Sequence, residues 1–203
     1  LRGRLDEIAG TITMSGIQQY ADQIVKANRI VIIACGTSWH AGLTAEYIFE
    51  ELCRTNVEVE YASEFRYRNP VISRGDVIIA ISQSGETADT LVAIENAKAK
   101  GAIILGVVNV VGSSIARASH GGAYTHAGPE IGVASTKAFT GQLAVLTMIA
   151  LKIAYIKGTI SNDRYMHLLN ELHEIPEKVA WVLKNSDQVK RLAEKYKDAR
   201  DFL

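Results

Sequence analysis

Two short runs rich in β-branched residues constrain the fold of this chain most strongly. The first run covers residues 29–35 and is closed by Gly36, and the second covers residues 76–81 and is closed by Ser82. A strand with one face in water alternates apolar and polar residues, whereas an unbroken apolar run of this length indicates a strand buried on both faces. Such strands are typical of parallel sheets covered by helices, and the sequence therefore predicts a parallel sheet.

The order of the remaining elements predicts a doubly wound α/β fold with five parallel strands. Weaker strand patterns and helical patterns alternate with the two strong strands, as they do in sheets of this kind. The weaker strands are expected at residues 57–61, 103–108 and 122–126, and the helices at residues 15–28, 38–54, 87–100, 113–118, 135–156, 163–184 and 186–197. We expect one domain, with its core at about residues 24–157 and extra C-terminal helices at about residues 161–198.

Composition excludes several classes of partner. The chain has 203 residues, of which 48% are hydrophobic and 22% are charged, as in an ordinary soluble domain. Lys plus Arg and Asp plus Glu both number 22, so no basic excess favours nucleic acid. The longest apolar stretch, residues 143–156, is shorter than the roughly 20 residues that cross a bilayer and is interpreted as a buried helix. The expected partners are therefore a small molecule and a second copy of the chain, with no nucleic acid and no membrane.

The cysteines and histidines do not predict a metal site. Only Cys35 and Cys53 occur, which fits a reducing compartment, and we expect the cytoplasm. Cys35 closes a buried strand and is interpreted as a core residue rather than a nucleophile. No two of the five histidines have the i, i+4 spacing of a helical metal site, so we expect neither a metal nor another cofactor. Because the sequence opens with Leu1 rather than methionine and stops where an apolar run begins, we also expect a fragment of a longer chain.

Two loops rich in hydroxyl groups follow the two strong strands and lead into predicted helices. They read Gly-Thr-Ser at residues 36–38 and Ser-Gln-Ser-Gly-Glu-Thr at residues 82–87. In an open parallel sheet, ligands bind beyond the carboxyl ends of the strands. The first N–H groups of a helix lack internal partners and carry partial positive charge, so they attract anions. The two loops are therefore the expected ligand site.

The second loop predicts a site for a single phosphate group. Ser82, Ser84 and Thr87 supply neutral donors, and Gly85 lets the backbone approach a ligand closely. The glycine-rich motifs of nucleoside triphosphate and dinucleotide sites do not occur in the sequence. The alternative interpretation is that Ser84 or Thr87 only caps the helix that follows.

A third segment, residues 128–137, leads into the long apolar helix and is expected to close over a ligand. Lys137 falls in the first turn of that helix, where the helix dipole disfavours a cation. A compensating anion is therefore expected nearby. A ligand and a structural ion pair with Glu130 both remain open.

Four segments of the sequence together resemble the glucosamine-6-phosphate synthase family. They are Cys-Gly-Thr-Ser at residues 35–38, Ala-Ser-Glu-Phe-Arg-Tyr-Arg at 62–68, Ser-Gln-Ser-Gly-Glu-Thr-Ala-Asp-Thr at 82–90 and Glu-Ile-Gly-Val-Ala-Ser-Thr-Lys-Ala-Phe at 130–139. One such motif alone would indicate only the wider sugar isomerase (SIS) family, but four in this order are specific. The resemblance covers about residues 24–156. It implies that the chain is the first of the two SIS halves that form the isomerase domain in this family.

The resemblance implies that the site binds a sugar phosphate such as fructose 6-phosphate or glucosamine 6-phosphate. In this interpretation Ser82, Gln83, Ser84 and Thr87 hold the phosphate, and Thr37, Ser38, Val133, Ala134 and Ser135 contact the sugar. The catalytic histidine, glutamate and lysine of the family lie in its second half or C-terminal tail. We therefore expect no catalytic residue in this chain, which alone would bind substrate without converting it.

The resemblance also implies what kind of longer protein the chain comes from. The family joins glutamine-derived ammonia to fructose 6-phosphate in hexosamine biosynthesis, and the parent protein would carry a glutaminase domain and a second SIS half and would form a homodimer. Two alternatives remain: a sugar-phosphate-sensing SIS domain of a transcription regulator, or another SIS-family sugar-phosphate isomerase. The residues before Leu1 and after Leu203 would distinguish them.

Overall fold

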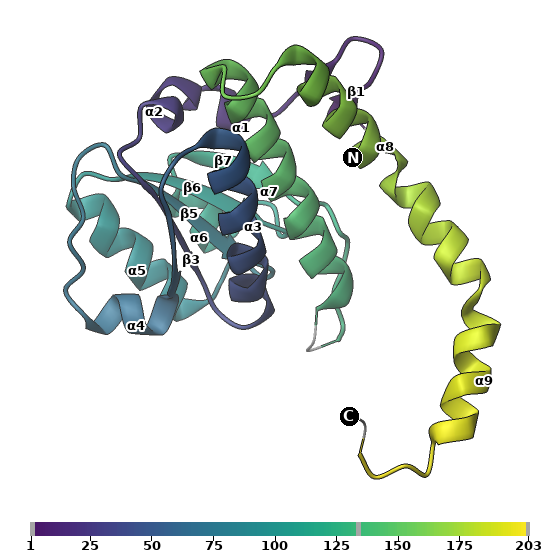
Figure 1. The fold of residues 1–203 in the computed structure, drawn as a ribbon. Helices are drawn as coiled ribbons and strands as arrows, with labels where there is room; N and C mark the ends of the chain where they lie inside the picture. Colours follow the sequence, from purple (N-terminus) through teal and green to yellow (C-terminus); the bar gives the residue numbers. More distant parts are fainter. Residues whose placement is uncertain (1–2, 133–134, 202–203) are drawn as a thin grey trace.

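A computed structural model describes residues 3–132 and 135–201 of the chain and contains a five-stranded parallel sheet (Figure 1). The strand order is β4-β3-β5-β6-β7, and every neighbouring pair is parallel. The strands are β3 (Ile30–Ala34), β4 (Val57–Tyr61), β5 (Val77–Ser82), β6 (Ile103–Val108) and β7 (Gly121–Tyr124). The prediction of a doubly wound α/β fold is therefore confirmed.

Strands β3 and β5 are buried on both faces, as their unbroken apolar runs indicate. Successive side chains of a strand point to opposite faces, so a strand between two cores must be apolar at every position. In β3, Ile30 and Ile32 enter one hydrophobic core, and Val31 and Ile33 enter the other. All five residues of β3 and all six of β5 are buried.

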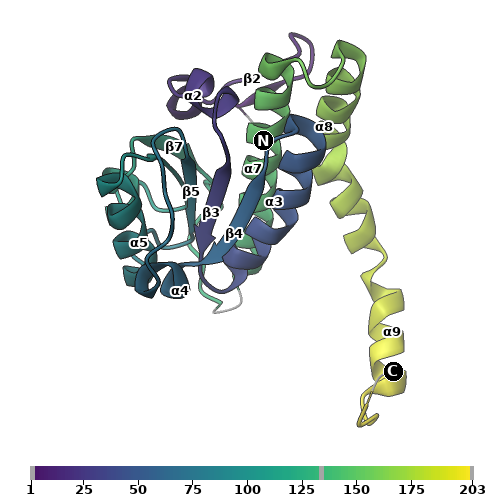
Figure 2. The same ribbon diagram turned by 60° about the vertical axis from the view of Figure 1, so that its left-hand side comes forward.

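Helices cover both faces of the sheet (Figures 1 and 2). Two long helices, α3 (Thr37–Cys53) and α7 (Thr136–Lys157), lie on one face and pack against each other. The other face carries α4 (Ala62–Tyr67), α5 (Ala88–Ala99) and α6 (Ser114–Ala118). The remaining helices are α1 (Ser15–Gln18), α2 (Ala21–Val25), α8 (Asn162–Lys184) and α9 (Ser186–Tyr196).

The prediction of one helix over residues 15–28 is wrong, because α1 and α2 are separate short helices. Gly16 lies so close to the edge strand β7 that an added Cβ would be 2.4 Å from the carbonyl oxygen of Gly122. Nearby, the Tyr20 hydroxyl donates to the carbonyl oxygen of His120 at 2.9 Å, and the Tyr20 backbone leaves the helical region. Packing against β7 thus overrides the local preference for a continuous helix.

The sequence patterns also missed three small elements. Strands β1 (Leu5–Asp6) and β2 (Thr11–Ile12) form an antiparallel pair, and α4 follows β4 without a loop. Strands of two residues and a helix of six are too short to show the periodicities on which a sequence prediction depends.

Helix α7 is long and apolar enough to cross a membrane when judged by length and composition alone. Half of its most apolar window is buried inside the molecule, where the helix packs on α3 and on the sheet. The core helix of a globular domain passes the same test, and the packing fits the predicted buried helix.

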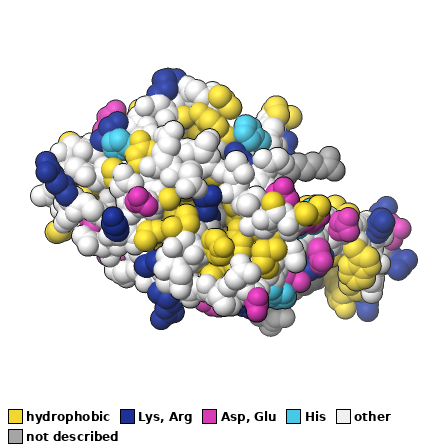
Figure 3. All heavy atoms as spheres, turned by 90° about the horizontal axis from the view of Figure 1, so that it is seen from above, with side chains coloured by type: hydrophobic (Ala, Val, Ile, Leu, Met, Phe, Trp, Pro, Cys, Tyr) yellow, Lys and Arg dark blue, Asp and Glu magenta, His cyan; other side chains and the backbone are white. Residues whose placement is uncertain are grey.

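The C-terminal helices leave the body of the molecule. The start of α8 packs on α7 through the buried residues Tyr165 and Leu169, whereas residues 174–196 are exposed throughout. We call residues 174–196 the C-terminal arm. Figure 2 shows it projecting away from the sheet, and Figure 3 shows hydrophobic side chains on its surface. Among them, Trp181, Val182 and Leu183 are each more than 60% exposed.

Candidate functional site

The two hydroxyl-rich loops lie together at the point where the sheet changes direction. The chain passes from β3 to the outer strand β4 and then returns to the other side of β3 to form β5. Strands β3 and β5 are direct neighbours, with Ile33 opposite Ala80. Loops 36–38 and 82–87 therefore leave adjacent strands at the same edge, and ligands of doubly wound sheets bind at such a switch point.

Loop 82–87 is organised by its own hydroxyl groups. Gly85 has a φ of +69° and donates its N–H to Ser82 Oγ at 3.0 Å. Ser82 Oγ also lies 3.0 Å from Thr87 Oγ1, and Ser84 Oγ accepts from the N–H of Glu86 at 3.2 Å. Ser82 is buried, whereas Gln83, Ser84 and Thr87 are partly exposed and accessible to a ligand.

The interpretation of Ser84 or Thr87 as a simple helix cap does not match this geometry. Thr87 occupies the N-cap position of α5, but its side chain makes no capping hydrogen bond and pairs with Ser82 instead. Ser84 accepts from Glu86, which precedes the helix. The N-terminus of α5 therefore has no side-chain cap within the described chain, and its first N–H groups are available to an anion.

The first residues of α6 and its N-cap residue Ser113 support loop 82–87 from behind. The carbonyl oxygen of Gly85 accepts from the N–H of Ile115 at 2.9 Å, and Glu86 Oε1 accepts from the N–H of Ser114 at 2.8 Å. Hydrogen bonds from Ser114 hold the pKa of Glu86 below its ordinary value. A Cβ on Gly85 would lie 2.0 Å from Ser113 Oγ, so only glycine fits at this contact. The sequence does not predict this support, because no local sequence pattern links residues 28 positions apart.

Hydrogen bonds of the first loop, residues 36–38, connect the start of α3 to β4 and α7. Gly36 has a φ of +58°, which a side chain would strain, and its N–H donates to the hydroxyl of Tyr61 at 3.2 Å. Thr37, the first residue of α3, is partly exposed. Ser38 is buried, and its Oγ accepts from Nε2 of Gln142 on α7 at 2.9 Å. Gln142 was not predicted as a site residue.

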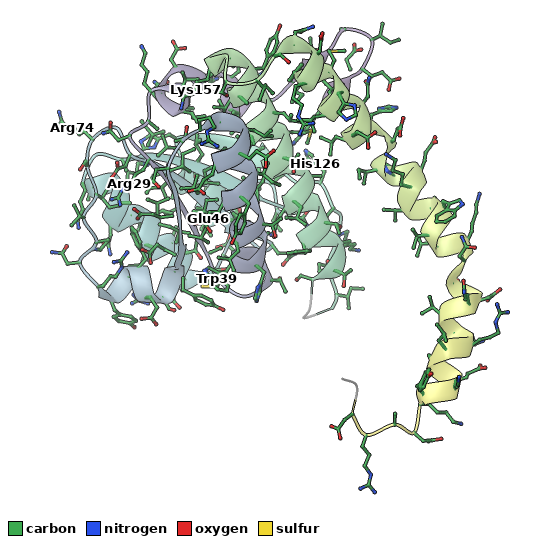
Figure 4. The ribbon with its side chains drawn as sticks, viewed as in Figure 1. Arg29, Trp39, Glu46, Arg74, His126 and Lys157 are labelled. Carbon is green, nitrogen blue, oxygen red and sulfur yellow. The ribbon has the colours of Figure 1, made fainter. Side chains whose placement is uncertain are left out.

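The third segment approaches the same end of the molecule. Figure 4 shows Trp39 at the lower end of α3, and α7 starts at that end and finishes with Lys157 at the opposite one. Ser135 is the N-cap residue of α7, with a φ of +47°. Of the residues predicted to contact the sugar, Val133 and Ala134 lie outside the described residues.

The Glu130 carboxylate binds the backbone at the start of α7 and does not pair with Lys137. Its Oε2 accepts from the N–H of Ala138 at 3.0 Å, which satisfies one of the unpaired donors of the helix. The ion pairs of the described chain do not include one between Glu130 and Lys137. Glu130 is thus the anion expected near this N-terminus, although it binds the backbone and leaves the exposed Lys137 ammonium group to solvent or a ligand.

A separate cavity of about 500 Å³ lies beside the edge strand β7. It is lined by β6, β7, α6 and residues of the N-terminal segment, including Arg4 and Gly16, and not by loop 82–87. Burial lowers the pKa of Arg4, and its Nη1 has no hydrogen-bond partner among the described residues. We retain the switch point as the candidate site because donor hydroxyls and an uncapped helix N-terminus meet there.

The described part of the chain has no cluster of metal-ligating side chains, and one of its two cysteines is buried in the core. Burial raises the pKa of the Cys53 thiol to about 12, and Cys53 Sγ donates to the carbonyl oxygen of Ala150 at 3.2 Å. Cys35 is partly buried at the end of β3. No group of three or more His, Cys, Asp and Glu side chains in the described ranges could hold a metal ion.

Comparison with known proteins relates this arrangement to one family. The SIS domain family matches residues 23–152. The chain is 54% identical over 203 residues to the glutamine–fructose-6-phosphate aminotransferase (isomerizing) of Bacteroides thetaiotaomicron and 56% identical over 204 residues to that of Chlorobaculum tepidum. In both cases the match covers the whole of this chain and 33% of the relative, so the chain spans about a third of the length of these curated relatives.

A solved structure with the same fold agrees with these matches. The C-terminal domain of glucosamine-fructose-6-phosphate aminotransferase from Francisella tularensis superposes with a TM-score of 0.86 at 38% sequence identity. The superposition covers 94% of this chain and 53% of that domain. The chain therefore corresponds to about half of a solved domain from a protein of this type.

Proposed function

The chain belongs to the SIS domain family, and from this premise we propose that it is a sugar-phosphate-binding half of the isomerase domain of a glutamine–fructose-6-phosphate aminotransferase. The observation that carries the proposal is the convergence of hydroxyl donors and the uncapped N-terminus of α5 at the switch point of the sheet. The names of the relatives favour this function over a transcription regulator or another sugar-phosphate isomerase.

Loop 82–87 suits a phosphate monoester. The partly exposed side chains of Gln83, Ser84 and Thr87 and the free N–H groups at the start of α5 can donate to phosphate oxygens. The loop holds no lysine or arginine, so binding would depend on neutral donors and the helix dipole. Ser82 is buried and would act by orienting Thr87.

The remaining predicted contacts concern the sugar. We propose that Thr37 and Ser38 at the start of α3, together with residues 133–135 at the start of α7, line the sugar portion of the substrate. Thr37 and Ser38 follow β3, the direct neighbour of the strand that carries loop 82–87, the proposed phosphate loop. This adjacency supports a ligand that bridges the two loops.

The activity of the parent protein is part of the same proposal. The chain spans about a third of its relatives, so we propose that the parent protein carries a glutaminase domain and a second SIS half, acts in the cytoplasm and forms a homodimer. The exposed apolar side chains of the C-terminal arm support further packing with the rest of such a protein. This chain would hold the substrate, and the groups that convert it would come from elsewhere.

Substitution of Ser84 tests the proposal. Calorimetric titration of the chain with fructose 6-phosphate should show binding, and Ser84→Ala should weaken it roughly tenfold or more, since a hydrogen bond to a charged group contributes about 1.5–3 kcal/mol. Ser186→Ala, on the exposed face of the arm, is the matched control and should bind as the wild type does. Equal affinity of the Ser84→Ala chain and the wild type would refute the phosphate assignment.

A further inference from the structure

A buried amide on α7 contacts the predicted sugar site. Gln142 is only 1% exposed, although it stands in the most apolar helix of the chain. Its Nε2 donates to Ser38 Oγ at 2.9 Å, and Ser38 itself is 6% exposed. A polar side chain at such a position is unfavourable unless its hydrogen bonds are satisfied. The contact therefore calls for an explanation beyond the packing of α3 against α7.

The direction of this hydrogen bond determines what the Ser38 hydroxyl can do. A serine hydroxyl carries one proton and two lone pairs. When Ser38 Oγ accepts from Gln142, its own proton is left to be donated elsewhere. Within the described chain, the bond from Gln142 is the one hydrogen bond recorded for this side chain. The Ser38 proton is thus available to an acceptor that the chain does not supply.

The opposite orientation of the amide is less favourable. If Oε1 of Gln142 faced Ser38, both N–H bonds of the amide would be buried without an acceptor. In the observed orientation one of them is used, and the unpaired oxygen is Oε1. Buried N–H groups without a partner are rarer than buried carbonyl oxygens without one. The amide therefore acts as a donor to Ser38.

Gln142 Oε1 gives a second, independent indication of a missing partner. It is buried and has no hydrogen-bond partner among the described residues. Buried polar atoms in native proteins are paired with protein, water or ligand. A donor hydrogen from a bound molecule, or from a water that the molecule holds, would satisfy it. Beside the start of α3, Gln142 Oε1 thus lacks a donor, and the Ser38 proton lacks an acceptor.

We propose that Gln142 is a positioning residue for the substrate site: it fixes the Ser38 hydroxyl as a donor to an acceptor oxygen of the bound ligand. This inference rests on the proposed sugar-phosphate function. Gln142 acts through Ser38, which lies in the first turn of α3 beside the phosphate loop. The acceptor oxygen belongs either to the phosphoryl group or to the sugar.

A double-mutant cycle between the two residues tests the proposal. Gln142→Met keeps the length of the side chain but removes the donor, and Ser38→Ala removes the hydroxyl. Calorimetric titration of the chain with fructose 6-phosphate should show Gln142→Met weakening binding by roughly three- to tenfold, the range for a typical neutral hydrogen bond. In the Ser38→Ala background the same change should have little further effect. A purely structural role would change the melting temperature without this coupling in affinity.

Inorganic phosphate distinguishes the two sources of the acceptor oxygen. If Gln142→Met weakens binding of both inorganic phosphate and fructose 6-phosphate, Ser38 donates to the phosphoryl group. If it weakens binding of fructose 6-phosphate alone, Ser38 donates to the sugar. Either result supports the positioning role.

Other outcomes overturn the inference and separate it from the proposed function. Failure of the wild-type chain to bind fructose 6-phosphate would refute both. Binding that is weakened by Ser84→Ala but unaffected by Gln142→Met, or equally affected in both Ser38 backgrounds, would refute only the role of Gln142. If the Gln142→Met chain does not fold, the side-chain amide resonance of Gln142 in the wild type decides. It should shift and exchange more slowly on saturation with fructose 6-phosphate, and an unchanged resonance would refute the inference.

Discussion

Replacement of Gly85 by alanine should lower the free energy of unfolding of the chain for two reasons, backbone strain and overpacking. The φ of Gly85 is +69°, a region that costs a residue with a Cβ about 1–2 kcal/mol. The new Cβ would also lie 2.0 Å from Oγ and 2.4 Å from Cβ of the buried Ser113. Overpacking of this kind costs about 1–3 kcal/mol. The total loss is therefore about 2–5 kcal/mol, a large share of the stability of an ordinary domain.

Two further variants separate backbone strain from overpacking. Gly158 has a φ of +71° and nothing within 4 Å of an added Cβ, so Gly158→Ala should show the backbone strain alone. The difference in unfolding free energy between the two alanine variants then measures the steric contact. Ser113→Gly removes the atoms that the new Cβ would meet, so the Gly85→Ala change should cost less in that background than in the wild type.

Urea denaturation followed by circular dichroism measures these differences, and thermal melting gives an independent check. For a chain of this length, 1 kcal/mol corresponds to a shift in Tm of about 2–4 °C. Gly85→Ala should therefore lower the Tm by about 4–20 °C. Equal losses for Gly85→Ala and Gly158→Ala, or no recovery in the Ser113→Gly background, would refute the claim that Ser113 packs so closely on loop 82–87 that only glycine fits at position 85.

Two other predictions concern buried groups away from the site. The side chain of Asp76 is only 3% exposed, and its carboxylate pairs with Arg29 at 3.2 Å. Arg29→Met should therefore lower the free energy of unfolding, measured by urea denaturation, by about 3 kcal/mol, the lower end of the range for breaking a buried ion pair. Arg74→Met, at an exposed position, is the control and should cost far less, and similar losses for both would contradict the assignment. The thiol of Cys53, whose pKa burial raises to about 12, should resist iodoacetamide at pH 8 while the partly buried Cys35 is alkylated. Mass spectrometry showing equal labelling of the two cysteines in the folded chain would contradict this.

The sheet could be predicted because runs of consecutive residues in the sequence mark its central strands. Every residue of β3 and every residue of β5 before Ser82 is apolar because each faces a core, and hydroxyl groups cluster in the loops that follow. The break between α1 and α2 could not be predicted, because it depends on the contact of Gly16 with Gly122 across the fold. For the same reason the sequence predicts Ser38 as a site residue but does not point to its partner Gln142, which is 104 positions away.

If loop 82–87 binds a phosphate group as we propose, its internal hydrogen bonds explain why neutral donors suffice. The N–H of Gly85 donates to Ser82 Oγ, which in turn pairs with Thr87 Oγ1 at 3.0 Å. If Ser82 donates to Thr87, the Thr87 proton is left for another acceptor, and each bond in the chain polarises the next. Thr87 is partly exposed and stands at the positive end of α5, so a phosphate oxygen there would meet a polarised hydroxyl and the helix dipole together. The loop thus holds its donors in position without a ligand, so the proposed binding would lose less free energy to their ordering than binding by a flexible lysine.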